Sequence, residues 1–439
     1  MNKGLLVLIA LGAFIFALPT TSDAKIELTG AALFSAQDVD FDTTPGDQDE
    51  DFNFNDPRVN LYVMGDVSDK ITVNARFWAN NDWSSENQRG AAAGNITGAV
   101  GAAGNLNDAV EMLRANVTLK DVAGSGFDLK VGTIDIPYGW EYGMRTNNGD
   151  DMKNDFITNS LLDINGGDAG ISLSGSFDMG QTSTPLAWEI ALINGGAVSD
   201  GLPSGAGLNG TSQARSNDDL AWAIRAEVGL QENLTVQASW YTNNQKKDGD
   251  QDPLNVGSVF FVNAVSHNNV AVGGNPGLAG QNVNLNGLAY TSAADNATYD
   301  RDMWELAAKY DYGQGYILGY WGKIDADSNS VVSATGGKRE WNYWGGQGRY
   351  NFDENSYLAV RYNVLDPDYK TNVAGHALGK PSMWTFAGGY KLADNARVKA
   401  EWSSFDEDGN DFGVNAGGNL ASNGNQDADA LTLAVGVSF

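Results

Sequence analysis

The sequence predicts an all-β protein: a transmembrane antiparallel β-barrel of about 16 strands, with short turns on one side and long loops on the other. Two observations lead to this class. The first is strict alternation in the last stretch, where Leu431, Leu433, Val435, Val437 and Phe439 are interleaved with Thr432, Ala434, Gly436 and Ser438. A period of two puts the large apolar set on one face of a strand and the small or polar set on the other. The ends of membrane strands lie in aromatic girdles, which suits an aromatic residue at position 439.

The second observation is the apolar segment at the start of the chain. Lys3 precedes residues 4–18 (GLLVLIALGAFIFAL), followed by the small residues Ser22 and Ala24. This order is typical of a secretory signal peptide, and the run falls short of the roughly 20 residues that a spanning helix needs. We therefore expect residues 1–24 to be a signal peptide cleaved near Ala24, and residues 25–439 to form the barrel in the bacterial outer membrane.

Composition narrows the function classes. The chain has no Cys, which excludes a disulfide framework, a cysteine-ligated metal and covalently attached haem. The formal net charge of −28 argues against nucleic acid as a partner. A mean hydropathy of −0.31 suits a barrel with a polar lumen and polar loops better than a bundle of membrane helices.

A unit made of a turn and a strand recurs along the chain. It occurs as LQEN-LTVQASWY (230–241), FDEN-SYLAVRYN (352–363) and LADN-ARVKAEWS (392–403), with DVSDK-ITVNARFW (66–78) as a variant. Asn tolerates the left-handed backbone that short hairpin turns require. We interpret these units as short periplasmic turns, each followed by a strand that rises to the outer face.

Alternating stretches divide the chain into about 16 candidate strands, an even number as in single-chain bacterial barrels. They span 25–37, 54–65, 71–80, 109–120, 127–135, 168–178, 186–195, 219–230, 234–243, 301–312, 315–325, 341–352, 356–365, 382–392, 396–406 and 430–439. The long loops are 38–53, 81–108, 136–167, 196–218, 244–300, 326–340, 366–381 and 407–429. A hairpin including residues 256–265 would raise the count to about 18. Because its central VFFV does not alternate, we favour a folded loop.

This pattern resembles the general trimeric porins of the Gram-negative outer membrane. The resemblance covers the whole chain after the signal peptide at the level of architecture, and no short motif carries it. It implies a homotrimer and a third long loop that folds into the barrel and narrows the pore. The corresponding loop is 136–167, and its acidic residues are Glu141, Asp150, Asp151, Asp155 and Asp163.

In many such porins, basic residues on early strands face this acidic loop. The positions that match by strand order and parity are Arg58, Arg76 and Arg114, and Lys130 lies on the same face of the following strand. Opposed fixed charges would make a transverse field across the pore. Ordinary ion pairs within the wall are the alternative interpretation.

Parity predicts which charged residues face the lumen. The basic set is Arg58, Arg76, Arg114, Lys120, Lys130, Arg225, Lys309, Lys323, Arg349, Arg361, Lys391, Arg397 and Lys399. The acidic set is Glu27, Asp56, Asp128, Glu189, Glu227, Glu305, Asp311 and Glu401. The wall thus leans positive while the third loop and the outer loops are acidic. The charge of the narrowest zone decides selectivity, so we favour a pore for small hydrophilic solutes with a preference for cations. An anion- or phosphate-selective pore is the alternative.

Alternating aspartates mark the loop ends. Oxygen ligands at alternate positions resemble half of a calcium loop, although none of the runs has the glycine of an EF-hand. The hypothesis is that Ca²⁺ or Mg²⁺ at the outer rim bridges the protein to anionic lipopolysaccharide, and a solvated acidic surface is the alternative. The candidate ligands are Asp38, Asp40, Asp42, Asp248, Asp250 and Asp252.

Other function classes have weaker support. The two histidines, His267 and His376, lie in expected loops without a nucleophile motif, so we expect no enzyme and no cofactor. A barrel that does not conduct, such as an adhesin or a sheath around an electron-transfer partner, stays open. So does a sugar-selective pore with an aromatic track supplied by Trp83, Tyr138, Trp140, Tyr142, Trp341 and Trp344.

Overall fold

The structure of the protein, a computed structural model, describes residues 25–43, 46–54, 58–80, 110–142, 154–157, 167–180, 182–193, 220–246, 254–256, 290–292, 298–328, 339–368, 380–408, 412–414, 420–422 and 426–439. Within these residues, no helix has the length and apolar character needed to cross a membrane.

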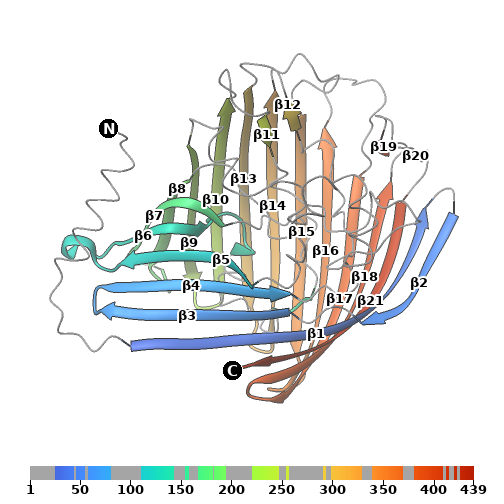
Figure 1. The fold of residues 1–439 in the computed structure, drawn as a ribbon, viewed down its shortest axis with the longest axis horizontal. Coiled ribbons are helices and arrows are strands. Elements are labelled where there is room, and N and C mark those ends of the chain that lie inside the picture. The colour runs from blue at the N-terminus through green and yellow to red at the C-terminus, as the bar shows by residue number, and fades with distance from the viewer. Residues whose placement is uncertain are drawn as a thin grey trace.

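Sixteen antiparallel strands form a closed barrel (Figure 1). Closure comes from β1 (Lys25–Thr43), which pairs with β3 (Arg58–Ser68) on one side and β21 (Gln426–Ser438) on the other. A further strand, β2 (Gly46–Phe54), joins the same sheet by pairing with the end of β1. Because every barrel strand has two neighbours, the barrel has no free edge in the membrane.

The other barrel strands follow in chain order, each pairing with the next. They are β4 (Ile71–Asn80), β5 (Val110–Leu119), β6 (Asp128–Asp135), β7 (Gly167–Phe177), β8 (Leu186–Ile193), β9 (Ala221–Gln231), β10 (Leu234–Lys246), β13 (Thr298–Asp311), β14 (Gly315–Ser328), β15 (Arg339–Asn351), β16 (Ser356–Asp368), β17 (Lys380–Ala393) and β18 (Ala396–Asp408). Short turns join them at one end of the barrel, the turn side. The opposite end of the barrel, where the strands on either side of the longer connections end, is called the loop side.

The prediction of a barrel of about 16 strands is confirmed. Sequence patterns missed β2 and two short hairpins on the loop side, β11 (Leu254–Val256) with β12 (Tyr290–Ser292) and β19 (Phe412–Val414) with β20 (Leu420–Ser422). The sequence of β2, GDQDEDFNF, is acidic and lacks apolar alternation, since it lies beyond the lipid-facing part of the barrel. The candidate strand 256–265 lies outside the described residues, apart from Val256 at the end of β11.

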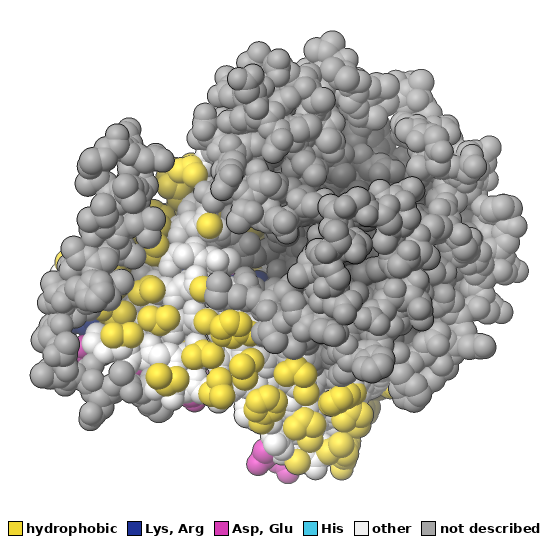
Figure 2. Space-filling model, in the orientation of Figure 1, with side chains coloured by type: hydrophobic (Ala, Val, Ile, Leu, Met, Phe, Trp, Pro, Cys, Tyr) yellow, Lys and Arg dark blue, Asp and Glu magenta, His cyan; other side chains and the backbone are white. Residues whose placement is uncertain are grey.

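The outer face of the barrel is apolar. In β21, Leu433 is 44% exposed while its neighbour Ala434 is 3% exposed, as the alternation predicts. Figure 2 shows hydrophobic side chains gathered over the described part of the outer surface, with acidic side chains at its lower edge. This surface suits contact with lipid, and the polar face of each strand lines the lumen.

Aromatic side chains mark two levels on the outer face. An upper row runs across β14–β18, with Trp321 paired in register to Trp344 and Tyr362 to Trp384. Neighbouring rings in this row are 4.4–5.8 Å apart, as for Tyr362 with Trp384 and for Trp384 with Phe386. A lower row near the turn side contains Tyr310, Tyr350, Phe352, Tyr390 and Phe439, all exposed. Two such rows are the expected boundaries of the membrane.

Lys323 is a correction to the predicted lumen set. It pairs in register with the outward-facing Trp304, and its exposed neighbour Trp321 points out of the barrel as well. Its ammonium forms ion pairs with Asp325 (2.9 Å) and Glu340 (3.2 Å) on the same outer face. These charges lie above the upper aromatic row, where the outward face leaves the hydrocarbon, so a polar residue there does not indicate the lumen.

The inner wall carries an apolar layer on the loop side. Tyr241, Met303, Ile324 and Trp341 are consecutive partners in register across β10, β13, β14 and β15. All four side chains are fully buried. The buried core of this barrel therefore lies on the inside of the wall.

The two ends of the described chain meet where the barrel closes. The amide of Gly30 donates to the carbonyl of Phe439 (2.8 Å), and the amide of Phe439 donates to the carbonyl of Gly30 (2.9 Å). A Cβ at position 30 would lie 2.5 Å from the Phe439 ring and 2.9 Å from the backbone oxygen of Asn60. Only glycine allows this approach without displacing the closing strand.

We expect Gly30→Ala to lower the free energy of unfolding by about 1–3 kcal/mol, because overpacking displaces the Phe439 ring or β3. Thermal unfolding of the folded barrel in detergent measures the change. The matched control is Gly65→Ala, since a Cβ at position 65 meets no atom within 4 Å. Equal midpoints for the two variants would contradict the role assigned to Gly30.

Candidate pore constriction

After β6, the chain turns into the barrel interior. Ile134, Ile136 and Tyr138 are at most 2% exposed, which places this segment against the inner wall rather than in water. Gly139 has φ +76°, a left-handed conformation that favours glycine, and it turns the backbone at this point. Burial of Ile136 and Tyr138, next to Ile134 at the end of β6, holds the start of the loop inside the barrel.

The backbone beyond Gly139 is held by Glu305 at the middle of β13, a set of contacts called the first anchor. The Trp140 amide donates to one carboxylate oxygen of Glu305 (2.6 Å), and the Tyr343 hydroxyl donates to the other (3.1 Å). The hydroxyls of Tyr138 and Tyr343 are also in hydrogen-bond contact (2.8 Å). Because burial and the nearby Glu305 charge raise the pKa of Tyr138 well above its ordinary value, its phenol stays neutral and serves as a hydrogen-bond group.

Charged and aromatic contacts extend the first anchor to neighbouring strands. Arg361 of β16 pairs with Glu141 of the loop (3.4 Å). The Tyr142 hydroxyl donates to Glu189 of β8 (2.7 Å), and the guanidinium of Arg225 lies 5.4 Å from the Tyr142 ring. Residues 138–142 therefore contact the inner wall on both sides of β13.

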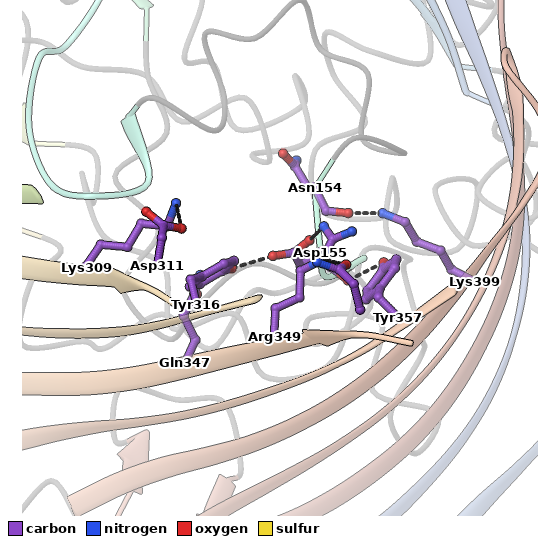
Figure 3. Close-up of polar contacts among 10 residues, drawn as sticks. Asn154, Asp155, Lys309, Asp311, Tyr316, Gln347, Arg349, Tyr357 and Lys399 are labelled. Carbon is purple, nitrogen blue, oxygen red and sulfur yellow. Dashed lines mark hydrogen bonds and ion pairs between the residues drawn. The ribbon is translucent and has the colours of Figure 1, made fainter. Parts of the chain in front are cut away.

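A second anchor lies nearer the turn side and centres on Asp155 (Figure 3). Its carboxylate forms an ion pair with Arg349 of β15 and accepts a hydrogen bond from the Tyr316 hydroxyl of β14. The Tyr357 hydroxyl of β16 donates to the Asp155 carbonyl (2.8 Å), and Lys399 of β18 donates to the carbonyl of the preceding residue, Asn154. Four wall strands thus bind two consecutive loop residues.

The next two residues complete the second anchor. Phe156 is 5% exposed, packs in a cluster with Tyr357, and lies 4.4 Å beneath the Arg361 guanidinium. The amide of Ile157 donates to Glu401 of β18 (2.5 Å). Since Arg361 contacts both anchors, through Glu141 and Phe156, the two loop segments share one part of the wall.

The predicted basic residues on early strands contact residues of the wall within the described part of the chain. Arg114 pairs with Asp135 (2.5 Å), at the end of β6. Lys130 lies 3.8 Å from Glu189. Arg76 donates to the side-chain oxygen of Asn60 (3.1 Å), and its guanidinium lies 5.6 Å from the Tyr62 ring. The position of Arg58 is defined only by its backbone pairing with Leu33 and Asn80.

Two of the predicted loop acids, Glu141 and Asp155, pair with wall arginines of later strands. The remaining loop acids, Asp150, Asp151 and Asp163, lie outside the described residues. Parity had placed Arg349 and Arg361 on the lumen face, but it gave no sign that they hold the loop. Only the pairing of distant strands brings them to it.

The aromatic track proposed for sugars does not form as a set. Trp344 points out of the barrel, where its ring lies 5.5 Å from Tyr362 in the upper aromatic row. Trp341 is buried on the inner wall at 0% exposure, and Tyr138 of the loop is buried against the wall at 2% exposure. Trp83 lies outside the described residues.

The aspartate runs are described only in part. Asp38 is exposed on β1, and Asp40 and Asp42 are placed by register opposite Asp429 and Asp427 of β21. Asp248, Asp250 and Asp252 lie outside the described residues. No group of three or more metal-ligating side chains forms within the part of the chain that the structure describes.

A closed barrel with an apolar outer face, a charged inner wall and its own loop bound inside defines a membrane channel of the outer-membrane type. The Gram-negative porin family matches residues 6–410, and the chain belongs to this family. It is an outer-membrane porin channel.

Solved structures share the fold at low sequence identity. The anion-selective porin from Comamonas acidovorans is 10% identical with a TM-score of 0.53, covering 95% of this chain and 100% of that one. The outer-membrane channel DcaP of Acinetobacter baumannii is 11% identical with a TM-score of 0.53, covering 96% and 99%. The outer-membrane protein OmpT of Vibrio cholerae is 11% identical with a TM-score of 0.52, covering 96% and 100%. No protein with a curated description matches the sequence.

We expect Asp155→Asn to release the second anchor, because it removes the carboxylate that forms the ion pair with Arg349. Because the Arg349 side chain is 28% exposed, the loss is smaller than the roughly 3–5 kcal/mol for a fully buried ion pair. Local opening still exposes the backbone to proteases. Trypsin should cleave after Lys153 or Arg145 at least about tenfold faster than in the wild type, as measured by mass spectrometry of the fragments.

The control for this experiment is Asp311→Asn. Asp311 pairs with Lys309 on the wall (2.8 Å) near the second anchor, and its charge change is the same. Cleavage of Asp155→Asn at the control's rate would show that Asp155 does not hold the loop.

Proposed function

We propose that the protein is a passive diffusion channel for ions and small hydrophilic solutes. The observation that carries the proposal is the binding of one loop to the inner wall at two anchors. A loop bound inside a barrel narrows the pore but leaves it open. The diameter of the narrowed pore sets the size limit for solutes. This favours the channel over an adhesin or a sheath, because neither needs an internal loop at defined depth.

The proposed selectivity is a slight preference for cations. The chain has a net charge of −28, and an acidic mouth raises the local concentration of cations. Ion pairs on the inner wall, such as Arg114 with Asp135 and Arg361 with Glu141, leave little net charge where the loop is bound. Both signs of small ion should therefore pass, with a modest bias.

We infer that the channel works without enzymatic chemistry and assembles as a homotrimer in contact with lipid and lipopolysaccharide. The family supports this, as does an OmpT of Vibrio cholerae described in a trimer form. Divalent ions at the aspartate runs stay a proposal that chelation followed by thermal unfolding would test. An unchanged unfolding temperature after chelation would oppose it.

Conductance across a planar bilayer tests the channel function. Purified protein under a salt gradient should give large open steps, often in groups of three, and a small reversal potential of cation-selective sign. Folded protein that gives no steps would overturn the proposal of an open pore.

The contribution of the wall to selectivity can be separated from that of the loops. Arg76→Gln removes a lumen cation held by Asn60, so the reversal potential should move toward stronger cation preference. Lys323→Gln removes the same charge from the outer face and should leave the potential unchanged. If both variants shift the reversal potential equally, the charge in the lumen does not determine the ion selectivity.

A further inference from the structure

A cavity of about 50 Å³ lies on the turn side of the barrel, between the turn at 352–355 and the adjoining ends of β17 and β18. Four basic side chains line it: Arg349, Lys391, Arg397 and Lys399. We propose that this cavity is a binding site for a small oxyanion, a carboxylate or phosphate group, at the turn-side end of the lumen. The inference rests on the proposed diffusion function, which it extends with a class of solute.

The sheet register places like charges next to each other at this site. Lys391 of β17 is directly opposite Arg397 of β18, and Lys399 follows on the same inward face. Like charges at opposed positions of a sheet destabilise it. An anion bound between them would relieve this repulsion, which gives the cluster a physical reason to bind one.

Arg349, which lines the cavity, is held in place by its neighbours. Its guanidinium stacks 4.2 Å from the Tyr357 ring, and its Nε donates to the side chain of Asn351 (2.8 Å). Gly389 provides the space that the Tyr357 ring occupies, since a Cβ there would overlap the ring. In Figure 3, Arg349 and Lys399 extend from the wall to the adjacent loop residues Asp155 and Asn154. A guanidinium held in place loses little further freedom when it binds an oxyanion.

Acidic side chains near the cavity oppose the binding of an anion. Asp353 and Glu354 line the cavity from the turn. Asp353 accepts hydrogen bonds from the amides of Asn355 (2.7 Å) and Ser356 (2.8 Å), which lower its pKa and engage its oxygen within the turn. Glu354 is exposed to water, which screens its charge.

Two further carboxylates lie beside the cations. Asp155 pairs with Arg349 from the loop, and Asp394 pairs with Lys391 at 2.6 Å. The Asp394 side chain is 99% exposed, so water weakens its field at the cavity, whereas Lys399 is buried in the wall. Water therefore screens the charge of Lys399 less than the charges of Asp394 and Glu354. The buried Asp155 offsets part of the charge of Arg349.

The size of the cavity limits the ligand. A group the size of a water molecule needs about 10–15 Å³ of cavity volume, so the cavity holds about four such groups. This matches a single carboxylate or phosphate group and is too small for a sugar ring. A larger solute would place only its anionic group here.

The test measures binding directly, without relying on conduction. Folded protein in detergent is titrated with inorganic phosphate, followed by ³¹P line broadening, and separately with acetate, followed by ¹³C line broadening. Removing one cation near the anion, in Lys391→Gln or Arg397→Gln, should weaken binding about three- to tenfold. Asp394→Asn frees Lys391 and should strengthen binding by a similar factor.

The control is Lys120→Gln, which removes an exposed lysine paired with Asp66 at another turn and should change nothing. Circular dichroism confirms that each variant is folded. Weaker binding in the two cation variants with stronger binding in Asp394→Asn supports the site, and the probe that responds identifies phosphate or carboxylate. Equal binding in all variants overturns the site, even if bilayer recordings show a conducting pore.

Discussion

The need to pair every backbone amide and carbonyl in lipid is the constraint on which this structure depends. Hydrocarbon offers no hydrogen-bond partner, so a sheet in a membrane must close on itself. Here closure is made by β1 with β21 and by the reciprocal backbone hydrogen bonds of Gly30 and Phe439. Gly30 leaves room for the Phe439 ring at this point. Once the barrel is closed, lipid can contact only the outer face, and the inner face is free to carry charge.

Some of the charged side chains inside the barrel hold the loop. Glu305, Arg361, Arg349 and Glu401 come from strands far along the chain, and each contacts a loop residue. An isolated charge on the wall of a low-dielectric shell is costly, and pairing offsets that cost. The same ion pairs also fix the depth of the loop in the barrel. The charged residues of the wall therefore determine the geometry of the constriction.

Period-two patterns determined the fold from sequence alone. The alternation ending at Phe439, the repeated turn units and the initial apolar segment predicted the barrel, its strand spans and the loop between β6 and β7. They could do so because the membrane imposes one apolar face on every strand, and this constraint acts locally. Where the constraint ends, the prediction weakened: Lys323, above the upper aromatic row, was assigned to the wrong face, and the acidic strand β2 was missed.

Tertiary structure decided which charges meet. Parity placed Arg349 and Arg361 on the lumen face, but the sequence did not identify them as the residues that bind the described part of the loop. Trp140 and Glu305 are 165 positions apart and touch only because the closed sheet brings β13 beside the loop. The choice among many lumen cations depends on register and on the path of the loop, both of which follow from contacts between distant segments. A local sequence pattern does not predict contacts between distant segments. It does predict which face of a strand each side chain lies on, because that depends only on alternation within the strand.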